Sequence, residues 1–138
     1  MMKSFILMLQ FFTRIPIPIP IEMDKKTVSR GILFFPLVGM LVGGITWMVY
    51  YLFGFINSDM AAIGAVIGAV VVTGGLHVDG LSDTCDGFFS VRSRERILEI
   101  MKDSRVGTFG VIAIILDFLV RYIIIKDLPR ETALAAFV

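Results

Sequence analysis

Charged residues and cysteine are scarce in this sequence of 138 residues. Only 18% of the residues are charged and 57% are hydrophobic, and the mean hydropathy is +0.86. A soluble domain of ordinary composition has about a quarter charged residues. The single cysteine, Cys85, excludes an internal disulfide bond and a cysteine-rich zinc site. The formal net charge of +1 excludes no class of partner, but the lack of a basic block argues against nucleic acid.

Charge is missing from three long stretches of the chain. Residues 31–55 contain no charged residue, residues 60–78 contain one ionisable group, and residues 106–125 contain two. A helix needs about 20 mainly apolar residues to cross a bilayer. We therefore predict an all-α fold, a polytopic transmembrane helical bundle with these three segments as spans. The alternative, a soluble protein with helices buried on all sides, rarely has three such runs in so short a chain.

The two ends of the chain differ from the predicted spans. Residues 5–12 are apolar but too few to span, so we expect an N-terminal interfacial or re-entrant helix. Pro16, Pro18 and Pro20 predict an extended segment after it. Residues 131–138 resemble the opening of a further span. We therefore expect residues 1–138 to form a single membrane domain that is incomplete.

Basic residues are distributed unequally between the two sides of the predicted bilayer. Ten Lys and Arg side chains lie either before the first span or between the second and third spans, and two follow the third. The link between the first two spans has none. Because cytoplasmic loops carry the excess of Lys and Arg, we predict a multi-pass protein of the cell (inner) membrane. Its segment 79–105 then lies on the cytoplasmic side.

Small residues four positions apart occur in two of the predicted spans. GMLVG (residues 39–43) and GAVIG (residues 64–68) match a pattern of close helix contact. Packing within the chain is the preferred interpretation, and a homo-oligomer is the alternative. Asp117 and Arg121, four residues apart in the third span, are expected to neutralise each other. A polar functional site inside the membrane is the second interpretation of this pair.

Most of the ionisable chemistry lies in GGLHVDGLSDTCDGFFS, residues 74–90. If the second helix continues past the membrane surface, Asp79, Asp83 and Asp86 fall within about 60° of one another on one face. Like charges so placed destabilise a helix unless a cation lies between them. Carboxylates at i and i+4 are near enough to share a hard divalent cation, so we predict Mg²⁺ ligands here. A solvated acidic helix end is the alternative.

Basic residues follow the acidic segment. RSRERILEIMKDSRVGTFG (residues 92–110) predicts an amphipathic helix that ends in a loop, where Lys102, Asp103 and Arg105 precede the third span. Lys and Arg beside an acidic metal site suit a diphosphate substrate. Anchoring of the chain at the membrane surface is the other interpretation. His77 is a candidate general acid or base or a metal ligand, and equally a histidine satisfied by its neighbours.

Four motifs resemble those of the cobalamin synthase family, the adenosylcobinamide-GDP ribazoletransferases. The motifs are FFTRIPIP (11–18), FPLVG (35–39), GGLHVDGLSDTCDG (74–87) and EIMKDSRVGTFG (99–110). The resemblance covers about residues 10–125 in family order. It implies a membrane enzyme that joins adenosylcobinamide-GDP to α-ribazole or its 5′-phosphate, releases GMP and uses Mg²⁺. It also implies a longer protein with further spans.

The resemblance assigns roles to individual positions of this chain. It places metal and diphosphate binding at Asp79, Asp83 and Asp86, and substrate binding at Lys102 and Arg105. The catalytic candidates it implies are Asp83, Asp103 and His77. Ser82 and Cys85 stand where alanine is expected between the aspartates, and both are small enough to leave the acidic face undisturbed.

Two other functions compete with this interpretation. A CDP-alcohol phosphotransferase also places spaced aspartates at a cytoplasmic helix end. It carries Asp-Gly-x-x-Ala-Arg, whereas residues 79–84 (DGLSDT) lack the Ala-Arg at the last two of those positions. A cation channel or transporter would use the aspartates as its ion entrance. It needs acidic residues along a path through the membrane, and the first two predicted spans have none.

Overall fold

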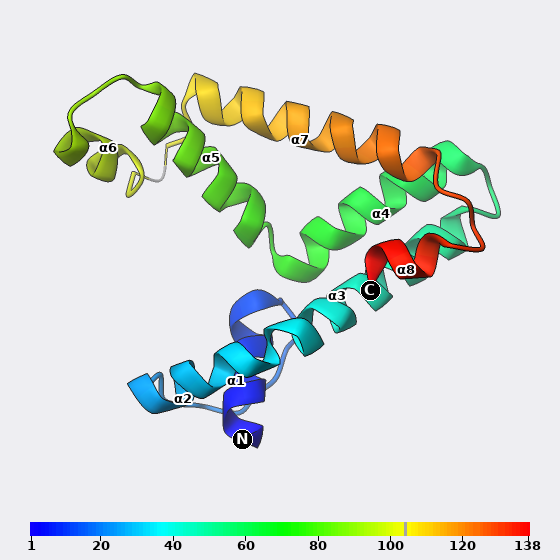
Figure 1. Cartoon of the computed structure of the whole chain (residues 1–138), viewed down its shortest axis with the longest axis horizontal. Coiled ribbons are helices and arrows are strands. Elements are labelled where there is room, and N and C mark those ends of the chain that lie inside the picture. The colour runs from blue at the N-terminus through cyan, green and yellow to red at the C-terminus, as the bar shows by residue number, and fades with distance from the viewer. Residues whose placement is uncertain (104) are drawn as a thin grey trace.

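A computed structural model describes residues 1–103 and 105–138, and the described residues form helices and no strand. Figure 1 shows their arrangement. In chain order the elements are α1 (Met2–Phe12), α2 (Lys25–Gly31), η1 (Ile32–Phe34), α3 (Phe35–Phe53), α4 (Ser58–Thr73), α5 (Leu76–Phe89), α6 (Arg94–Ile100), α7 (Thr108–Lys126) and α8 (Ala133–Phe137).

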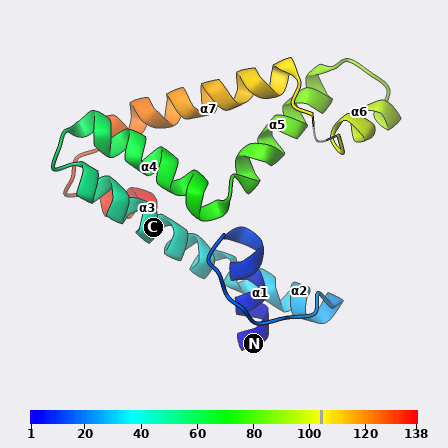
Figure 2. The same cartoon turned by 180° about the vertical axis from the view of Figure 1, so that it is seen from behind.

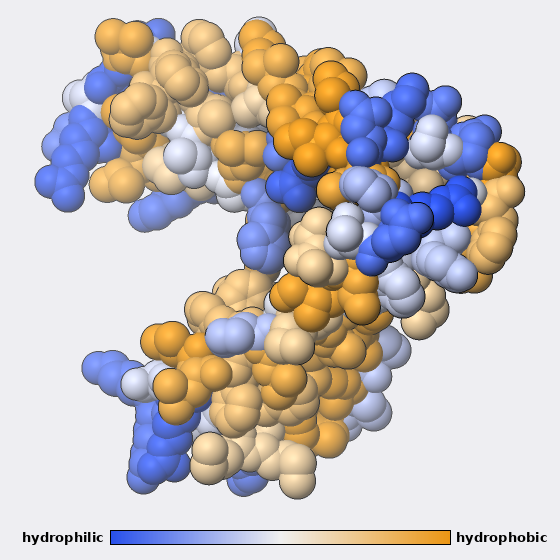
Figure 3. All heavy atoms as spheres, turned by 45° about the vertical axis from the view of Figure 1, so that its right-hand side comes forward, coloured by the Kyte–Doolittle hydropathy of each residue, from blue (hydrophilic) through white to orange (hydrophobic). Residues whose placement is uncertain are grey.

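Two helical segments are long and apolar enough to cross a membrane. They are Lys25–Phe53, which comprises α2, η1 and α3, and Thr108–Lys126, which is α7. Large hydrophobic side chains on both are exposed, as lipid-facing side chains are, and hydrophilic ones gather mainly toward the ends of the elements (Figure 3). The all-α membrane fold predicted from the sequence is confirmed.

The second predicted span does not continue as one straight helix. It ends at Thr73, and α5 leaves it at an angle of 89°. Gly74 and Gly75 have φ angles of +65° and +75°, a left-handed conformation that glycine adopts at little cost. The expected unbroken helix from residue 60 into the aspartates is therefore wrong. Figure 1 shows α4, α5 and α7 as three sides of a triangle with the glycine pair at one corner.

The N-terminal helix is followed by a proline-rich segment without helix or strand. α1 lies against α2, η1 and one end of α3 (Figure 2). Its apolar face packs on Val38 through Leu7, Met8 and Leu9. The Gln10 side-chain amide donates hydrogen bonds of 2.9 and 2.8 Å to two carbonyls of the proline-rich segment, which fixes that segment beside α1.

Helices α3 and α4 pack closely because α4 is poor in side-chain volume. A Cβ atom at Gly64 would lie 3.1 Å from Phe53 Cγ and 3.3 Å from Val49 Cγ1. Packing within the chain, the preferred interpretation of GAVIG, is confirmed. After α7 the chain returns to α3, and α8 packs against that helix. In the segment between α7 and α8, the Leu128 carbonyl accepts a 2.9 Å hydrogen bond from the Tyr50 hydroxyl of α3.

Ion pairs hold the polar side chains of α7. Asp59 at the start of α4 accepts a 2.7 Å hydrogen bond from the Tyr122 hydroxyl and lies 2.7 Å from Lys126 Nζ. These contacts join the beginning of α4 to the end of α7. Within α7, Arg121 Nε lies 2.8 Å from both carboxylate oxygens of Asp117. The predicted mutual neutralisation of Asp117 and Arg121 is confirmed.

Replacing Gly75 tests whether the bend requires its left-handed backbone. No atom lies within 4 Å of a Cβ built at Gly75, so Gly75→Ala adds backbone strain without a steric clash. We expect it to lower the free energy of unfolding by about 1–2 kcal/mol. The matched control is Gly80→Ala, in an equally open position inside α5, which should raise that free energy by about 0.5–1 kcal/mol. Denaturant titration in detergent measures both, and a neutral Gly75→Ala would contradict the prediction.

Candidate active site

The candidate site is built on α5, which carries three carboxylates on fourteen residues. Asp79 lies in its first turn, where a negative charge interacts favourably with the helix dipole. Close packing on α7 fixes the helix, because Gly110 has no side chain and a Cβ there would overlap Ser82 and Asp86. Ser82 is accordingly only 2% exposed. The prediction that the aspartates share one helix is confirmed, although that helix is separate from α4.

Asp86 binds the beginning of α7. Its carboxylate accepts hydrogen bonds of 2.7 Å from the Gly107 N–H and 2.8 Å from the Gly110 N–H. Gly107 is the N-cap residue of α7 and offers no side chain of its own for capping. A carboxylate near these N–H groups also interacts favourably with the positive end of the helix. Asp86 therefore acts as a cap supplied from a different helix.

Asp83 lies one turn from each of the other two carboxylates. Its pKa is raised above the usual range of aspartate, first by desolvation and then by the negative charges of Asp79 and Asp86. The charges of Asp79 and Asp86 therefore destabilise the charged form of Asp83. Among the described residues, no cation offsets this effect. Asp79 is exposed at the beginning of the helix. The electrostatics are those of an acidic face with an excess of negative charge.

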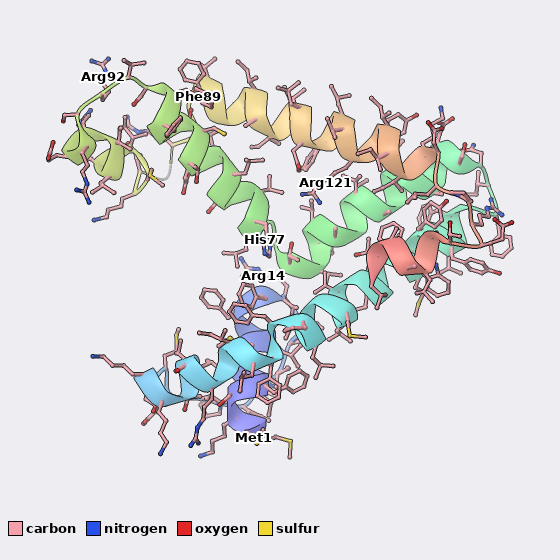
Figure 4. The ribbon with its side chains drawn as sticks, in the orientation of Figure 1. Met1, Arg14, His77, Phe89, Arg92 and Arg121 are labelled. Atoms are coloured by element: carbon pink, nitrogen blue, oxygen red, sulfur yellow. The ribbon has the colours of Figure 1, made fainter. Side chains whose placement is uncertain are left out.

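The C-terminal end of α5 and the basic residues that follow it line a cavity of about 560 Å³. Asp86, Asp103 and Arg105 line this cavity, together with Arg92 and Arg96. Figure 4 shows Arg92 at this end of the molecule. The structure thus brings together three of the predicted site residues. It also adds two arginines, Arg92 and Arg96, that were not among the predicted site residues.

Asp103 and Arg105 form an ion pair across this loop. Arg105 Nη2 lies 2.7 Å from Asp103 Oδ2, and Arg105 Nε lies 3.1 Å from both carboxylate oxygens. The guanidinium lowers the pKa of the Asp103 carboxyl. The pair orients the guanidinium at the cavity, whereas Lys102 is exposed and does not line it.

His77 lies apart from the other predicted catalytic residues. Its ring stacks on the Phe12 ring with centroids 6.0 Å apart and planes inclined by 23°. It lines a largely apolar cavity of about 490 Å³ between α3, α4 and α7, which Asp117 and Arg121 also line. Figure 4 shows His77 at the bend and Arg121 on α7. The structure therefore does not place His77 at the cavity of Asp103 and Arg105.

The predicted magnesium site can be compared with the donors present. Among residues 1–103 and 105–138, no three His, Cys, Asp or Glu side chains lie close enough together to hold a metal ion. Mg²⁺ usually takes one or two carboxylates and completes its shell with water and phosphate oxygens. Asp79 and Asp83, four residues apart, suit that requirement, while both oxygens of Asp86 already accept hydrogen bonds from α7.

Sequence reasoning missed two features of the site. Arg14 is one of the ten basic residues that predict the cytoplasmic side, and it was given no role in the site. It lines a third cavity together with Asp79. The capping of α7 by Asp86 joins residues 21 and 24 positions apart. Neither has a signal in local spacing, because both depend on how distant segments pack.

The fold and the site define a polytopic helical membrane protein whose carboxylates and arginines gather around one short helix. Residues 4–138 match the family described as cobalamin-5-phosphate synthase. The chain is 47% identical over 138 residues to an adenosylcobinamide-GDP ribazoletransferase of Clostridium novyi, covering 99% of this chain and 55% of that protein. Another, from Clostridium botulinum (strain Langeland), is 44% identical over 128 residues, covering 92% and 52%.

A relative from Listeria welshimeri with the same name is 50% identical over 119 residues, covering 86% of this chain and 48% of that protein. The chain belongs to the cobalamin-5-phosphate synthase family, the family that its four motifs resemble. It spans about half the length of the curated relatives it matches. No solved structure matches it.

The cap at Asp86 predicts a clear difference between two aspartates of α5. Asp86→Ala leaves two backbone N–H groups of α7 without their acceptor and should lower the free energy of unfolding by about 3 kcal/mol. Asp79→Ala, which removes only a favourable helix-dipole interaction, should cost no more than about 1 kcal/mol. Denaturant titration in detergent compares the two. Equal losses would show that Asp86 does not cap α7.

The raised pKa of Asp83 predicts how stability depends on pH without a divalent cation. A group whose pKa is higher in the folded state adds stability below its unfolded pKa and loses that contribution as pH rises through the folded value. Asp83→Asn should therefore be more stable than the wild type at neutral pH and equal to it at about pH 3. Asp127→Asn, on an exposed residue beyond α7, is the control. Equal stability of Asp83→Asn and wild type at both pH values would refute this assignment.

Proposed function

We propose that this chain provides part of the phosphate-binding site of an adenosylcobinamide-GDP ribazoletransferase. The site consists of α5 and the basic residues that follow it, Arg92, Arg96 and Arg105. In the proposed reaction a hydroxyl of α-ribazole, or of its 5′-phosphate, attacks the phosphorus attached to cobinamide. A new P–O bond forms, the bond to the GMP portion breaks, and adenosylcobalamin or its phosphate is produced. The observation that carries the proposal is Asp86 beside Asp103 and Arg105, with Asp79 and Asp83 on the same helix, within the region that matches the family.

Mg²⁺ is part of the proposal. Asp79 and Asp83 would hold it, with Asp86 close by on the same helix but committed to capping α7. When bound, Mg²⁺ neutralises charge on the diphosphate oxygens and favours departure of the phosphate leaving group. The excess negative charge on this face, expressed in the raised pKa of Asp83, supports cation binding there.

Protein side chains accept the proton and stabilise the phosphate oxygens in the proposed reaction. The proton of the attacking hydroxyl goes to a carboxylate, which we assign to the aspartates of α5 rather than to Asp103, because the Arg105 guanidinium lowers the pKa of Asp103 and makes it a weaker base. Asp103 instead orients Arg105, whose guanidinium stabilises the equatorial oxygens and the departing GMP, with Lys102 nearby in the sequence. His77 stays a candidate acid or base at the neighbouring apolar cavity. The excess of basic residues favours the cytoplasmic side for all these groups.

A transfer assay tests the proposed function. Membranes carry this chain either alone or extended at its C-terminus by the second half of the Clostridium novyi relative. They receive adenosylcobinamide-GDP, α-ribazole and Mg²⁺, and chromatography measures adenosylcobalamin and GMP. We expect the extended chain to form both products in equal amounts. Removal of Mg²⁺ by a chelator should stop the reaction.

Asp83→Asn in the extended chain should lower the rate of transfer at least about 100-fold, because it removes a proposed ligand of Mg²⁺. Asp127→Asn, the matched change on an exposed residue beyond α7, should keep the rate within about two-fold. Immunoblotting of membranes verifies that both variants insert. An extended chain that inserts but forms no GMP, or an Asp83→Asn variant of near-normal rate, would refute the assignment.

A further inference from the structure

Arg14 reaches the bend between α4 and α5 from the beginning of the sequence. Its backbone N–H donates a 2.7 Å hydrogen bond to the Val72 carbonyl. Its side chain lies across Gly74, where a Cβ atom would come within 2.6 Å of Arg14 Cγ and 2.8 Å of Cδ. Figure 4 shows Arg14 and His77 together at the bend. The missing side chain of Gly74 therefore leaves the space that Arg14 occupies.

Arg14 lines a cavity of about 540 Å³ in which it is the basic residue and Asp79 the acidic one. In the part of the chain that the structure describes, no carboxylate lies within ion-pair distance of the Arg14 guanidinium. The lining also includes Ser82, whose Oγ is buried without a hydrogen-bond partner. A buried polar atom without a partner is uncommon in proteins. The cavity thus offers an exposed arginine without an ion-pair partner and a carboxylate, and its wall includes a buried hydroxyl without a partner.

The beginning of α5 adds positive potential to the same cavity. Gly75 is its N-cap residue and supplies no side-chain cap, and Gly75 and Leu76 both line the cavity. The first N–H groups of a helix lack intrahelical acceptors and form a favourable site for a phosphate group. Phe11 and Ile114 give the lining an apolar portion. A phosphate, a sugar hydroxyl and an apolar ring are the ligand groups that match these donors and surfaces.

The two basic cavities lie at different ends of α5. Asp79 belongs to the cavity of Arg14, and Asp86 belongs to the cavity of Arg105. Seven residues separate these aspartates, which corresponds to about 10 Å along a helix. The two phosphorus atoms of a diphosphate are only about 3 Å apart, much less than the rise from Asp79 to Asp86. Two phosphate-containing ligands, or two separate phosphate groups, fit this arrangement better.

We propose that Arg14 and the beginning of α5 bind the terminal phosphate of a phosphorylated acceptor, a ribazole 5′-phosphate. This rests on the proposed function, in which Arg105 serves the diphosphate of the donor. Asp83, between Asp79 and Asp86 on α5, lies between the two phosphate sites. Arg14 is thus a residue that determines preference for a phosphorylated over a free acceptor.

The kinetic test uses the extended chain with two acceptors, α-ribazole and α-ribazole 5′-phosphate. We expect Arg14→Ala to lower the ratio of kcat/KM for the phosphorylated acceptor to that for the free acceptor at least 30-fold. Arg14→Lys should lower it less, because an ammonium keeps the charge but loses the two-point contact. Arg105→Ala should reduce both values and leave the ratio unchanged. Lys25→Ala, on an exposed residue of α2, is the matched control for loss of charge.

A binding test separates this inference from the proposed function. The probe is ribose 5-phosphate, with ribose as its uncharged control, in a detergent that contains no phosphate. We expect the chain to bind ribose 5-phosphate at least ten-fold more tightly than ribose, and Arg14→Ala to abolish that difference. Added guanidinium ion should partly restore it. Such binding without any transfer in the kinetic test would refute the proposed function and leave the phosphate site standing.

Two outcomes overturn the inference. Active enzyme whose acceptor ratio is the same in wild type and Arg14→Ala shows that Arg14 does not recognise the acceptor phosphate. Vesicles of phosphatidylglycerol and phosphatidylcholine test the other source of phosphate, the lipid headgroup. If Arg14→Ala leaves binding of ribose 5-phosphate unchanged and weakens binding of phosphatidylglycerol, Arg14 is a lipid contact.

Discussion

The Asp86 carboxylate connects the acidic helix to the membrane-spanning helix that follows it. It accepts hydrogen bonds from the N–H groups of Gly107 and Gly110, so the end of α5 and the beginning of α7 are held together through a buried charge. At the other end of α5, the glycine pair turns the chain by 89°. With the contacts of Asp59 joining α4 to α7, these features fix all three corners of the triangle. The position of every candidate site residue on α5 depends on that closure.

The same interaction divides the three aspartates into different roles. Their spacing places them on one face, but a carboxylate that already accepts two N–H groups has less capacity for a metal ion. Asp79 and Asp83 are left as the accessible pair, and Mg²⁺ commonly requires no more. Capping also offsets the negative charge of Asp86, whereas Asp83 stays uncompensated and has a raised pKa. Identical side chains on one helix thus acquire different chemistry from what packs against them.

Local patterns predicted the parts of the structure that local energetics determine. Hydropathy predicted three spans, of which two are helices long enough to cross a membrane and the third is interrupted by the bend. It also indicated the short N-terminal helix, and the spacing of four residues indicated the Asp117–Arg121 pair. The bend was missed because glycine is common in membrane helices and its backbone angles cannot be read from its identity. Arg14 and the Asp86 cap were missed because both contacts join segments distant in sequence. Tertiary packing decides them, and no periodicity records it.

The bend explains how a chain so poor in charge can present so many ionisable groups to one another. A straight continuation of α4 would carry Asp79 and Asp83 away from the proline-rich segment along the direction of the span. Turning by 89° brings the start of α5 beside Arg14 and its end beside Arg105. Charges near a bilayer are costly unless they are paired or solvated. The bend at Gly74 and Gly75 therefore places the polar helix α5 after the apolar helices α3 and α4, with Arg14 near its beginning and Arg105 near its end.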